Sequence, residues 1–259
     1  MSRAVELRDR LRRYYTTYYR DILGIPDWSV LVGLREDEER QERGRLDRLQ
    51  RLLGGDAALR GRILNVGCGT GGFNLVAEGA GARVVGVDAD AEAIAICALK
   101  REKGGSAFVR AAAERLPFPD GSFDVVYCFS AIEHVESVEE SVAEMARVTR
   151  RGGLIYVHTP NAWSWYEGHY KLLWAPFLPA SLGRLYLRAR GRPSEYLATL
   201  RRLTPGAMRR AFARAGVSDL RFHDDEPPRE SLGPLRLPIG LYYRLSGISP
   251  FIELVARKP

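Results

Sequence analysis

The stretch from Ile63 to Asp90 reads ILNVGCGTGGFNLVAEGAGARVVGVDAD, and it decides the fold class of this chain. An apolar run leads into a glycine-rich loop, Gly67 to Gly72. A helical pattern follows, and a second apolar run ends at Asp88. Glycines permit a tight turn and let a ligand lie against backbone that carries no side chain. Asp88 comes 21 residues after Gly67, where a carboxylate at a strand end can bind ribose hydroxyls. The stretch therefore predicts a strand–helix–strand unit with a nucleoside-type binding site.

The same alternation continues along the chain. Runs that are apolar on both faces suit strands of a parallel sheet covered by helices on each side. The segments between these runs have helical spacing, which favours repeated strand–helix–strand units. We predict an α/β fold with a doubly wound, mostly parallel, seven-stranded sheet. Its expected strands are RILNV (62–66), ARVVGVD (82–88), SAFVR (106–110), FDVVYCF (123–129), LIYVH (154–158), VSDLRFH (217–223) and FIELVARKP (251–259).

Residues outside this core suggest four segments. The first 60 residues read as two helices, the second heavily charged and ending at Gly54-Gly55. A tract rich in aromatics, proline and arginine then interrupts the alternation where this kind of fold builds a lid. The prolines at 227, 228, 234 and 238 predict a loop between the last two strands. The expected organisation is an N-terminal helical extension (1–60), a cofactor-binding core (61–160), a lid insertion (161–203) and a C-terminal part of the core sheet (204–259).

Composition excludes several classes of protein. With 46% hydrophobic residues the chain can form a sizeable core. No run approaches the roughly 18 apolar residues that a membrane-spanning helix needs. The first residues, MSRAVELRDRLRRYY, mix charges throughout, so no secretory signal is expected. Cys68, Cys97 and Cys128 lie far apart without a CxxC pair, which argues against a disulfide framework and predicts a cytoplasmic protein.

Charge is concentrated in one segment of the chain. The net charge is +7, and the segment from Arg184 to Arg221 contains ten arginines against two acidic residues, leaving the rest at −1. An anionic partner is one interpretation of this segment. The other is a solvated helical surface, which charge runs usually are, and this is the one we favour. No oligomeric state is indicated by the sequence.

A second block decides which nucleoside is bound. Gly67, Gly69 and Gly72 also satisfy the GxGxxG pattern of nicotinamide dehydrogenases. Residues 111–135 distinguish a dehydrogenase from other nucleoside-binding proteins. They read AAAERLPFPDGSFDVVYCFSAIEHV. With this block the sequence resembles the class I S-adenosylmethionine-dependent methyltransferases, in particular their small-molecule and quinone-biosynthesis group. The resemblance implies S-adenosylmethionine as cofactor. It rests on the glycine loop, Asp88, the LPFPDGSFDVV block, Glu133-His134-Val135 and the RxxxxGG pattern from Arg147 to Gly153.

The resemblance also implies individual roles around the cofactor. The glycine loop would line the methionine moiety, Asp88 would bind the ribose, and Ala89 would pack beside the adenine. Many relatives have an aspartate where Ala112 stands, so the contact to the adenine amino group is expected either to be absent here or to come from Glu114. The implied cofactor residues are Gly67, Cys68, Gly69, Gly71, Asp88, Ala89, Ala113, Glu114, Phe129 and Ser130, the last two at the sulfonium end.

Methyl transfer requires that the acceptor atom be aligned with the methyl carbon and that water be excluded. It requires a base only if the acceptor must lose a proton. His134 follows the fourth strand and His158 ends the fifth, so both are candidate bases. The alternative for His134 is packing beneath the following helix. In some quinone methyltransferases the Glu-His pair joins an earlier glutamate to hold a divalent metal. Ser130 stands at that position here, and we expect no metal.

The aromatic tract is expected to hold the acceptor. The tract has three interpretations. It could form an apolar pocket, the core of an accessory helical layer, or a weak contact with a membrane surface. The predicted acceptor residues are Trp163, Trp165, Tyr166, His169 and Tyr170, with Trp174 and Phe177 nearby. We predict methyl transfer to a small organic acceptor, at an oxygen of an aromatic or hydrophobic metabolite.

Two other functions stay open from the sequence. The first is an RNA or other nucleic-acid methyltransferase. It is disfavoured because the position of a (D/N)PPY motif reads Cys128-Phe129-Ser130-Ala131, and because no cysteine follows a proline as in cytosine C5 enzymes. No recognisable RNA-binding module is present either. The second alternative is a cofactor-binding protein without catalysis.

Overall fold

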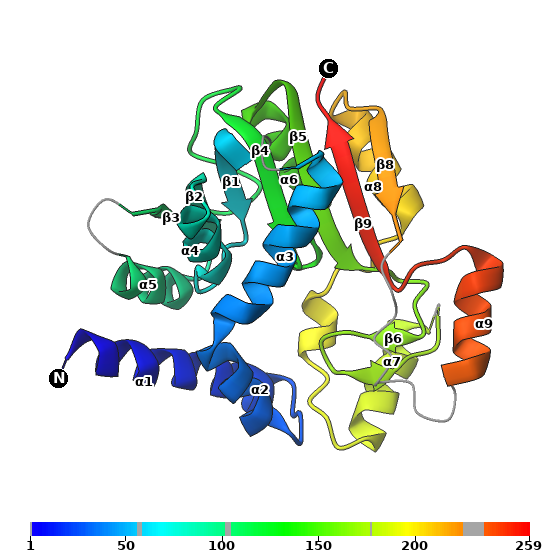
Figure 1. Cartoon of the computed structure of the whole chain (residues 1–259). Coiled ribbons are helices and arrows are strands. Elements are labelled where there is room, and N and C mark those ends of the chain that lie inside the picture. The colour runs from blue at the N-terminus through cyan, green and yellow to red at the C-terminus, as the bar shows by residue number, and fades with distance from the viewer. Residues whose placement is uncertain (1, 56–58, 102–104, 177, 225–235) are drawn as a thin grey trace.

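A seven-stranded sheet forms the centre of the protein in this computed structural model, which describes residues 2–55, 59–101, 105–176, 178–224 and 236–259 (Figure 1). The strand order is β3-β2-β1-β4-β5-β9-β8, with β9 antiparallel to both neighbours and the other described pairs of β1 to β5 parallel. The predicted doubly wound, mostly parallel sheet is confirmed. The strands are β1 Arg62–Val66, β2 Arg83–Asp88, β3 Ala107–Arg110, β4 Phe123–Phe129, β5 Thr149–Pro160, β8 Asp219–His223 and β9 Phe251–Arg257.

Among the described residues, five helices flank this sheet, and side-chain caps fix where three of them begin. Asp90 accepts hydrogen bonds from the backbone N–H groups of Glu92 and Ala93. Ser137 and Thr204 cap their helices in the same way, and a proline follows Thr204 in the first turn, where no N–H is needed. The five helices are α3 Glu38–Leu53, α4 Gly72–Gly79, α5 Ala91–Lys100, α6 Val138–Val148 and α8 Pro205–Arg214.

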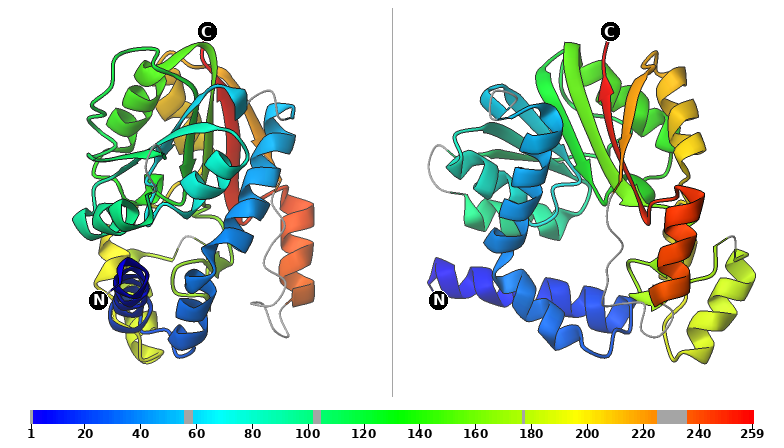
Figure 2. Two further views of the ribbon diagram at one scale, coloured as in Figure 1. Left: turned by 60° about the vertical axis from the view of Figure 1, so that its left-hand side comes forward. Right: turned by 45° about the vertical axis from the view of Figure 1, so that its right-hand side comes forward.

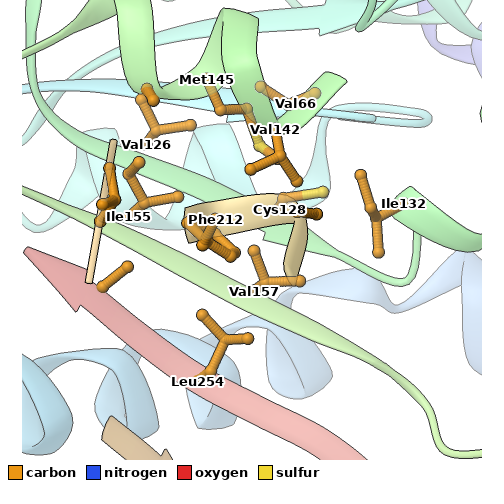
Figure 3. Close-up of a cluster of buried hydrophobic side chains, with 14 of the residues drawn as sticks. Val66, Val126, Cys128, Ile132, Val142, Met145, Ile155, Val157, Phe212 and Leu254 are labelled. Carbon is orange, nitrogen blue, oxygen red and sulfur yellow. The ribbon is translucent and has the colours of Figure 1, made fainter. Parts of the chain in front are cut away.

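The core is built from the apolar runs that predicted the strands. On one face of the sheet, Val126 and Ile155 pack with side chains from α6, α8 and β9, including Met145 (Figure 3). On the other face, Tyr127 of β4 stacks on Phe73 of α4 with ring centroids 4.0 Å apart, and Leu46 and Leu49 of α3 belong to the same cluster. Both faces of the central strands are therefore buried, as their continuous hydrophobicity requires.

Accessory elements gather at the end of the molecule away from the C-terminus in every view (Figures 1 and 2). This is the edge where the parallel strands end. The N-terminal helices and the insertion share a small core of their own, in which Tyr19 and Leu23 pack with Tyr170 and Trp174. The accessory elements are α1 Arg3–Thr16, the π-helical η1 Thr17–Ile22, α2 Trp28–Glu36, η3 Ile132–His134, the hairpin strands β6 Tyr166–Glu167 and β7 Leu172–Leu173, α7 Ala180–Ala189, η4 Tyr196–Thr199 and α9 Arg236–Ser246.

Two expectations about these elements were wrong. Residues 236–246 form α9, although the prolines predicted a loop there; Pro238 lies in the first turn, where the missing N–H has no intrahelical acceptor. The prolines at 227, 228 and 234 lie outside the described residues. The N-terminal segment holds α2 in addition to the two expected helices. Within the parts of the chain that the structure describes, no helix is long and apolar enough to cross a membrane.

Candidate functional site

A cavity of about 1190 Å³ opens at the carboxyl ends of β1, β2 and β4. Ligands of open α/β sheets bind at this edge, where the strand order reverses between β1 and β4. Its walls come from the glycine loop, the strand ends, η3, the N-terminal helices and η4. All ten sequence-predicted cofactor residues except Gly71 line it, namely Gly67, Cys68, Gly69, Asp88, Ala89, Ala113, Glu114, Phe129 and Ser130.

The glycine loop has a backbone that only glycine adopts readily. Gly67 has a φ of +73°, and a Cβ added to it would lie 2.1 Å from the Cβ of Ala131. Gly69 has a φ of +51°, and nothing lies within 4 Å of a Cβ placed there, so the backbone of Gly69 faces open space. The N–H groups of Gly67 and Cys68 both donate to the carbonyl of Val87. Gly67 is thus needed for the close approach of the chain that follows β4, and Gly69 leaves room for a ligand.

Asp88 lies at the carboxyl end of β2, beside this loop. Its Oδ2 accepts the N–H of Gly69 at 2.8 Å, and its Oδ1 accepts the N–H of Asp90 at 2.9 Å. Burial raises the pKa of Asp88, although these hydrogen bonds oppose the rise. A carboxylate has about four acceptor positions, so those left can take the hydroxyls of a ribose.

Glu114 lines the cavity from the segment that connects β3 to β4. Its Oε1 accepts backbone N–H groups of Glu136 at 2.7 Å and Ser137 at 3.2 Å. Ala112 and Ala113 line the cavity next to it. The carboxylate of Glu114 therefore fixes the loop before α6 through Oε1. Its other oxygen, Oε2, is the one that could accept a hydrogen bond from a ligand.

The N-terminal helices form a wall of this cavity that the sequence analysis did not anticipate. The hydroxyl of Tyr14 donates to Asp90 at 3.0 Å. Tyr15 donates to Glu38 at 2.9 Å and lies 2.8 Å from the hydroxyl of Thr70 in the glycine loop. Glu38 also forms a buried ion pair with Lys100. Because these contacts join residues far apart in the sequence, helical spacing of the tyrosines was their only signal.

Phe129 ends β4, Ser130 follows it, and both line the cavity. Ser130 has a φ of +49°, an uncommon backbone for a residue other than glycine, and its N–H donates to the carbonyl of His158 at 2.8 Å. The ring of Phe129 stacks on His158 at 4.2 Å, and the guanidinium of Arg45 lies 4.1 Å from the centre of the same ring. His158 is buried behind Phe129 and does not line the cavity.

His134 does line the cavity. Its Nδ1 lies 3.4 Å from the hydroxyl of Tyr196, and that hydroxyl lies 3.2 Å from the hydroxyl of Tyr18. Burial lowers the pKa of His134, and the nearby His169 lowers it further, whereas Glu133 opposes both. His134 is therefore the neutral imidazole expected of a base at neutral pH.

Behind His134 lies a buried group of charged side chains. Glu133 is buried, and its Oε1 lies 3.6 Å from Nε2 of His169 and 3.9 Å from Nε2 of His134. The other nitrogen of His169 lies 2.9 Å from Glu167. Burial alone would lower the pKa of His169, but the two carboxylates raise it to about 10. The pKa of Glu133 is lowered, because His169 and His134 outweigh the effect of its burial.

Metal binding is the other chemistry open to this group. One ligand atom each from Glu133, His134 and His169 lie within 4.8 Å of one another, close enough for a single ion. A histidine side chain must be neutral to bind a metal ion. His169 lies between the carboxylates of Glu133 and Glu167, so a metal ion would have to displace these ion pairs to bind its imidazole. The expectation of no metal stays a prediction.

The aromatic tract is placed differently from its predicted role. Trp163, Trp165, Tyr166, His169 and Tyr170 do not line the cavity. Tyr170 and Trp174 pack against the N-terminal helices, and Trp165 packs against Tyr242 of α9. Tyr196, later in the same insertion, reaches the cavity instead. The tract is thus the core of an accessory layer, one of its three interpretations; Phe177 lies outside the described residues.

These observations fit a nucleoside-based cofactor. An open face at Gly69, a carboxylate with free acceptor positions at Asp88 and small side chains at Ala89 and Ala113 lie along one wall. The cavity volume is large enough for such a ligand together with a second small molecule.

Several known proteins are similar to part of this chain. Residues 64–157 match the family model of the methyltransferase domain. The chain is 34% identical over 121 residues to the ubiquinone biosynthesis O-methyltransferase of Aromatoleum aromaticum, covering 45% of this chain and 50% of that one. It is 37% identical over 95 residues to the uncharacterized methyltransferase YcgJ of Bacillus subtilis, covering 36% and 38%. The chain thus spans half or less of the length of these curated relatives.

A solved structure extends the likeness of fold beyond that segment. The S-adenosylmethionine dependent methyltransferase from Mesorhizobium loti has a TM-score of 0.57 at 19% identity, covering 82% of this chain and 96% of that one. The resemblance seen in the sequence is therefore confirmed over residues 64–157, and beyond them the likeness is one of fold. Residues 64–157 of this chain therefore match a methyltransferase domain, and the fold around them is the one seen in the Mesorhizobium loti structure.

Proposed function

We propose that this protein transfers a methyl group from S-adenosylmethionine to an oxygen of a small aromatic or hydrophobic acceptor, with His134 as the base. The observation that carries the proposal is the position of His134. It lies in the same cavity as the glycine loop and Asp88, with its pKa lowered, beside the hydroxyl of Tyr196. The O-methyltransferase activity named for the Aromatoleum aromaticum relative supports an oxygen acceptor.

The glycine loop and Asp88 would hold the cofactor. The loop backbone at Gly67 and Gly69 would pack against its methionine part, Asp88 would accept hydrogen bonds from the ribose, and Ala89 and Ala113 would flank the adenine. When bound, the cofactor supplies a methyl group on a sulfonium, which leaves as a neutral thioether. The protein therefore needs only to align the acceptor oxygen with the methyl carbon and to keep water out.

The acceptor would lie at the other end of the cavity. Phe129, Tyr18 and Ile22 give this end an apolar and aromatic lining, which suits an aromatic or hydrophobic molecule. The N-terminal helices cover the same space, so they would exclude water from the reacting atoms. The five residues first predicted to hold the acceptor would then act through packing beneath this cover.

His134 would remove the proton that the acceptor hydroxyl loses. Its Nδ1 faces the cavity beside Tyr196, and its Nε2 faces the carboxylate of Glu133. The imidazolium that forms would be stabilised by that carboxylate. His158, the other candidate base, would act on the site through Phe129, because its ring stacks behind that residue.

The test measures methyl transfer from radiolabelled S-adenosylmethionine to a panel of phenols, catechols and hydroxyquinones, with total RNA as a separate acceptor. The variant His134→Gln should lower kcat by about 10²- to 10⁴-fold, the usual contribution of a positioned base. It should leave binding of S-adenosylhomocysteine, measured by calorimetry, within about twofold. His223→Gln, on β8 at the edge of the sheet, is the matched control and should retain full kcat.

Three results would overturn the proposal. Full kcat in His134→Gln would show that His134 is not the base. Methylation of RNA with no small-molecule turnover would favour the nucleic-acid alternative. Tight cofactor binding without turnover on any acceptor would favour a binding protein without catalysis.

A further inference from the structure

Two charged residues of α3, Glu42 and Arg45, line the cavity. A Cβ added to Gly72, the last residue of the glycine loop, would lie 3.1 Å from Cγ of Glu42. The guanidinium of Arg45 lies 4.1 Å from the centre of the Phe129 ring, at the end of β4. The two side chains therefore lie between the loop that follows β1 and the end of β4, where the strand order reverses.

Glu42 is buried, yet one of its carboxylate oxygens has no partner among the described residues. Its Oε1 forms an ion pair with Nη1 of Arg45, whereas its Oε2 accepts no hydrogen bond. The side chain of Glu42 is only 7% exposed. A buried oxygen without a donor is costly, and such atoms in folded proteins usually have a partner. Oε2 therefore indicates a donor that comes from a ligand in the cavity.

The neighbouring carboxylate of Glu38 has no such unmet need. It is also buried and lines the cavity, but Tyr15 and Thr70 both donate to its Oε1, and Lys100 pairs with its Oε2. Every oxygen of this side chain thus has a partner within the protein. The missing donor is specific to Glu42, about one helical turn further along α3.

The opposite charges of Glu42 and Arg45 fit one part of the proposed cofactor. S-adenosylmethionine ends in an amino acid, whose ammonium and carboxylate are bonded to the same carbon. The ammonium donates hydrogen bonds, as Oε2 of Glu42 requires, whereas the sulfonium has no N–H to donate. A guanidinium has five N–H donors, so Arg45 can bind a carboxylate while Nη1 stays on Glu42. The two side chains are therefore complementary to a zwitterion.

Their place in the cavity agrees with the order of groups in the cofactor. Asp88, proposed to bind the ribose, ends β2, and the loop that carries His134 follows β4. The strand between β2 and β4 is β1, and Glu42 packs against the last residue of the loop that follows it. The amino acid part, which is joined to the ribose through the sulfur, would thus lie between Asp88 and the reacting end.

We propose that Glu42 binds the α-ammonium and Arg45 the α-carboxylate of the methionine part of S-adenosylmethionine. Both residues lie outside residues 64–157, so the match to the methyltransferase domain does not supply them. These roles rest on the cofactor of the proposed function, but not on its acceptor or its base. They make α3 a part of the cofactor site as well as a cover of the sheet.

Calorimetry with three nucleosides tests the two roles separately, on the full chain. S-adenosylhomocysteine has both charged groups, 5′-(3-aminopropyl)thioadenosine has only the ammonium, and 5′-methylthioadenosine has neither. Glu42→Gln should weaken binding of the first two by about 10- to 100-fold, the range for a hydrogen bond to a charged group, and leave the third within about twofold. Arg45→Gln should weaken only S-adenosylhomocysteine to that extent.

Matched variants come from the outer surface of the same helix. Glu39 and Arg43 form the same kind of ion pair, but their side chains are 68% and 62% exposed, and neither lines the cavity. Glu39→Gln and Arg43→Gln should bind all three nucleosides as the wild type does. Undiminished binding of 5′-methylthioadenosine shows that a variant is folded, because this ligand still needs the ribose and adenine contacts.

The outcomes distinguish these roles from the proposed function. Wild-type protein that does not bind S-adenosylhomocysteine would overturn both. If the wild type binds it, equal binding by Glu42→Gln would overturn the assigned roles alone, and so would an equal loss for all three nucleosides. Wild-type protein that binds 5′-methylthioadenosine as tightly as S-adenosylhomocysteine would do the same without any variant, because the amino acid part would then be unbound.

Discussion

Replacing His169 by glutamine is expected to move the pH dependence of methyl transfer upward. His169 is held as an imidazolium by Glu133 and Glu167, and its ring centre lies 5.1 Å from that of His134. That positive charge disfavours protonation of His134, so it contributes to the lowered pKa of this proposed base. Glutamine keeps a polar side chain of similar length but removes the charge. The pKa of His134 should then rise.

The distance sets the size of this effect. Two unit charges 5.1 Å apart interact by about 0.8 kcal/mol in a medium like water and by about 3 kcal/mol at an effective dielectric constant of 20. The midpoint of the pH–rate profile should therefore rise by about half a pH unit to two pH units. Because the His134 side chain is 32% exposed, solvent screening favours the lower half of that range.

The measurement is kcat against pH between about 5 and 9, at saturating acceptor and cofactor. Binding of S-adenosylhomocysteine at pH 8 verifies that His169→Gln is folded, and His223→Gln serves as the matched control. A folded His169→Gln enzyme whose profile coincides with that of the wild type would refute the electrostatic coupling. A downward movement would show that the sign of the argument is wrong.

The cofactor site and the charged network give three further predictions. Asp88→Ala should weaken S-adenosylhomocysteine binding by about 1.5–3 kcal/mol in calorimetry, whereas tighter binding of NAD than of this ligand would contradict the site. Gly67→Ala should abolish that binding and lower the melting temperature, because its Cβ would clash with Ala131 at a positive φ. The folded-state pKa of His169, about 10, lies above its unfolded value near 6.5. Its stabilisation is therefore complete below about pH 6.5 and lost as the pH rises toward 10, so denaturation midpoints should fall over this range in the wild type and stay flatter in His169→Gln.

Features that depend on local pattern could be predicted from the sequence. β1 and β4 have the predicted bounds, because a run apolar on both faces is stable only between two helical layers. The loop at Gly67 and the acid at Asp88 were found for the same reason: their backbone and spacing requirements lie within one strand–helix–strand unit. The cavity encloses both, along with Phe129 and His134.

Features that depend on long-range contact could not be predicted. Tyr15 reaches Glu38 and Thr70 only once the N-terminal helices have folded over the sheet. His169 meets Glu133 across 36 residues, and no local pattern pairs them. The aromatic tract carried the right composition for either a pocket or a core, and only the packing of Tyr170 against the N-terminal helices distinguishes the two.

The walls of the cavity have a consequence for how acceptors can change among relatives. The segment that matches the methyltransferase domain, residues 64–157, supplies the wall proposed to hold the cofactor, whereas Tyr18, Ile22 and Tyr196, which line the end proposed for the acceptor, lie outside it. These two parts of the chain can therefore diverge at different rates. Proteins that agree closely over the shared segment can act on unrelated molecules, and exchanging the flanking helices between them would be the direct way to exchange their acceptors.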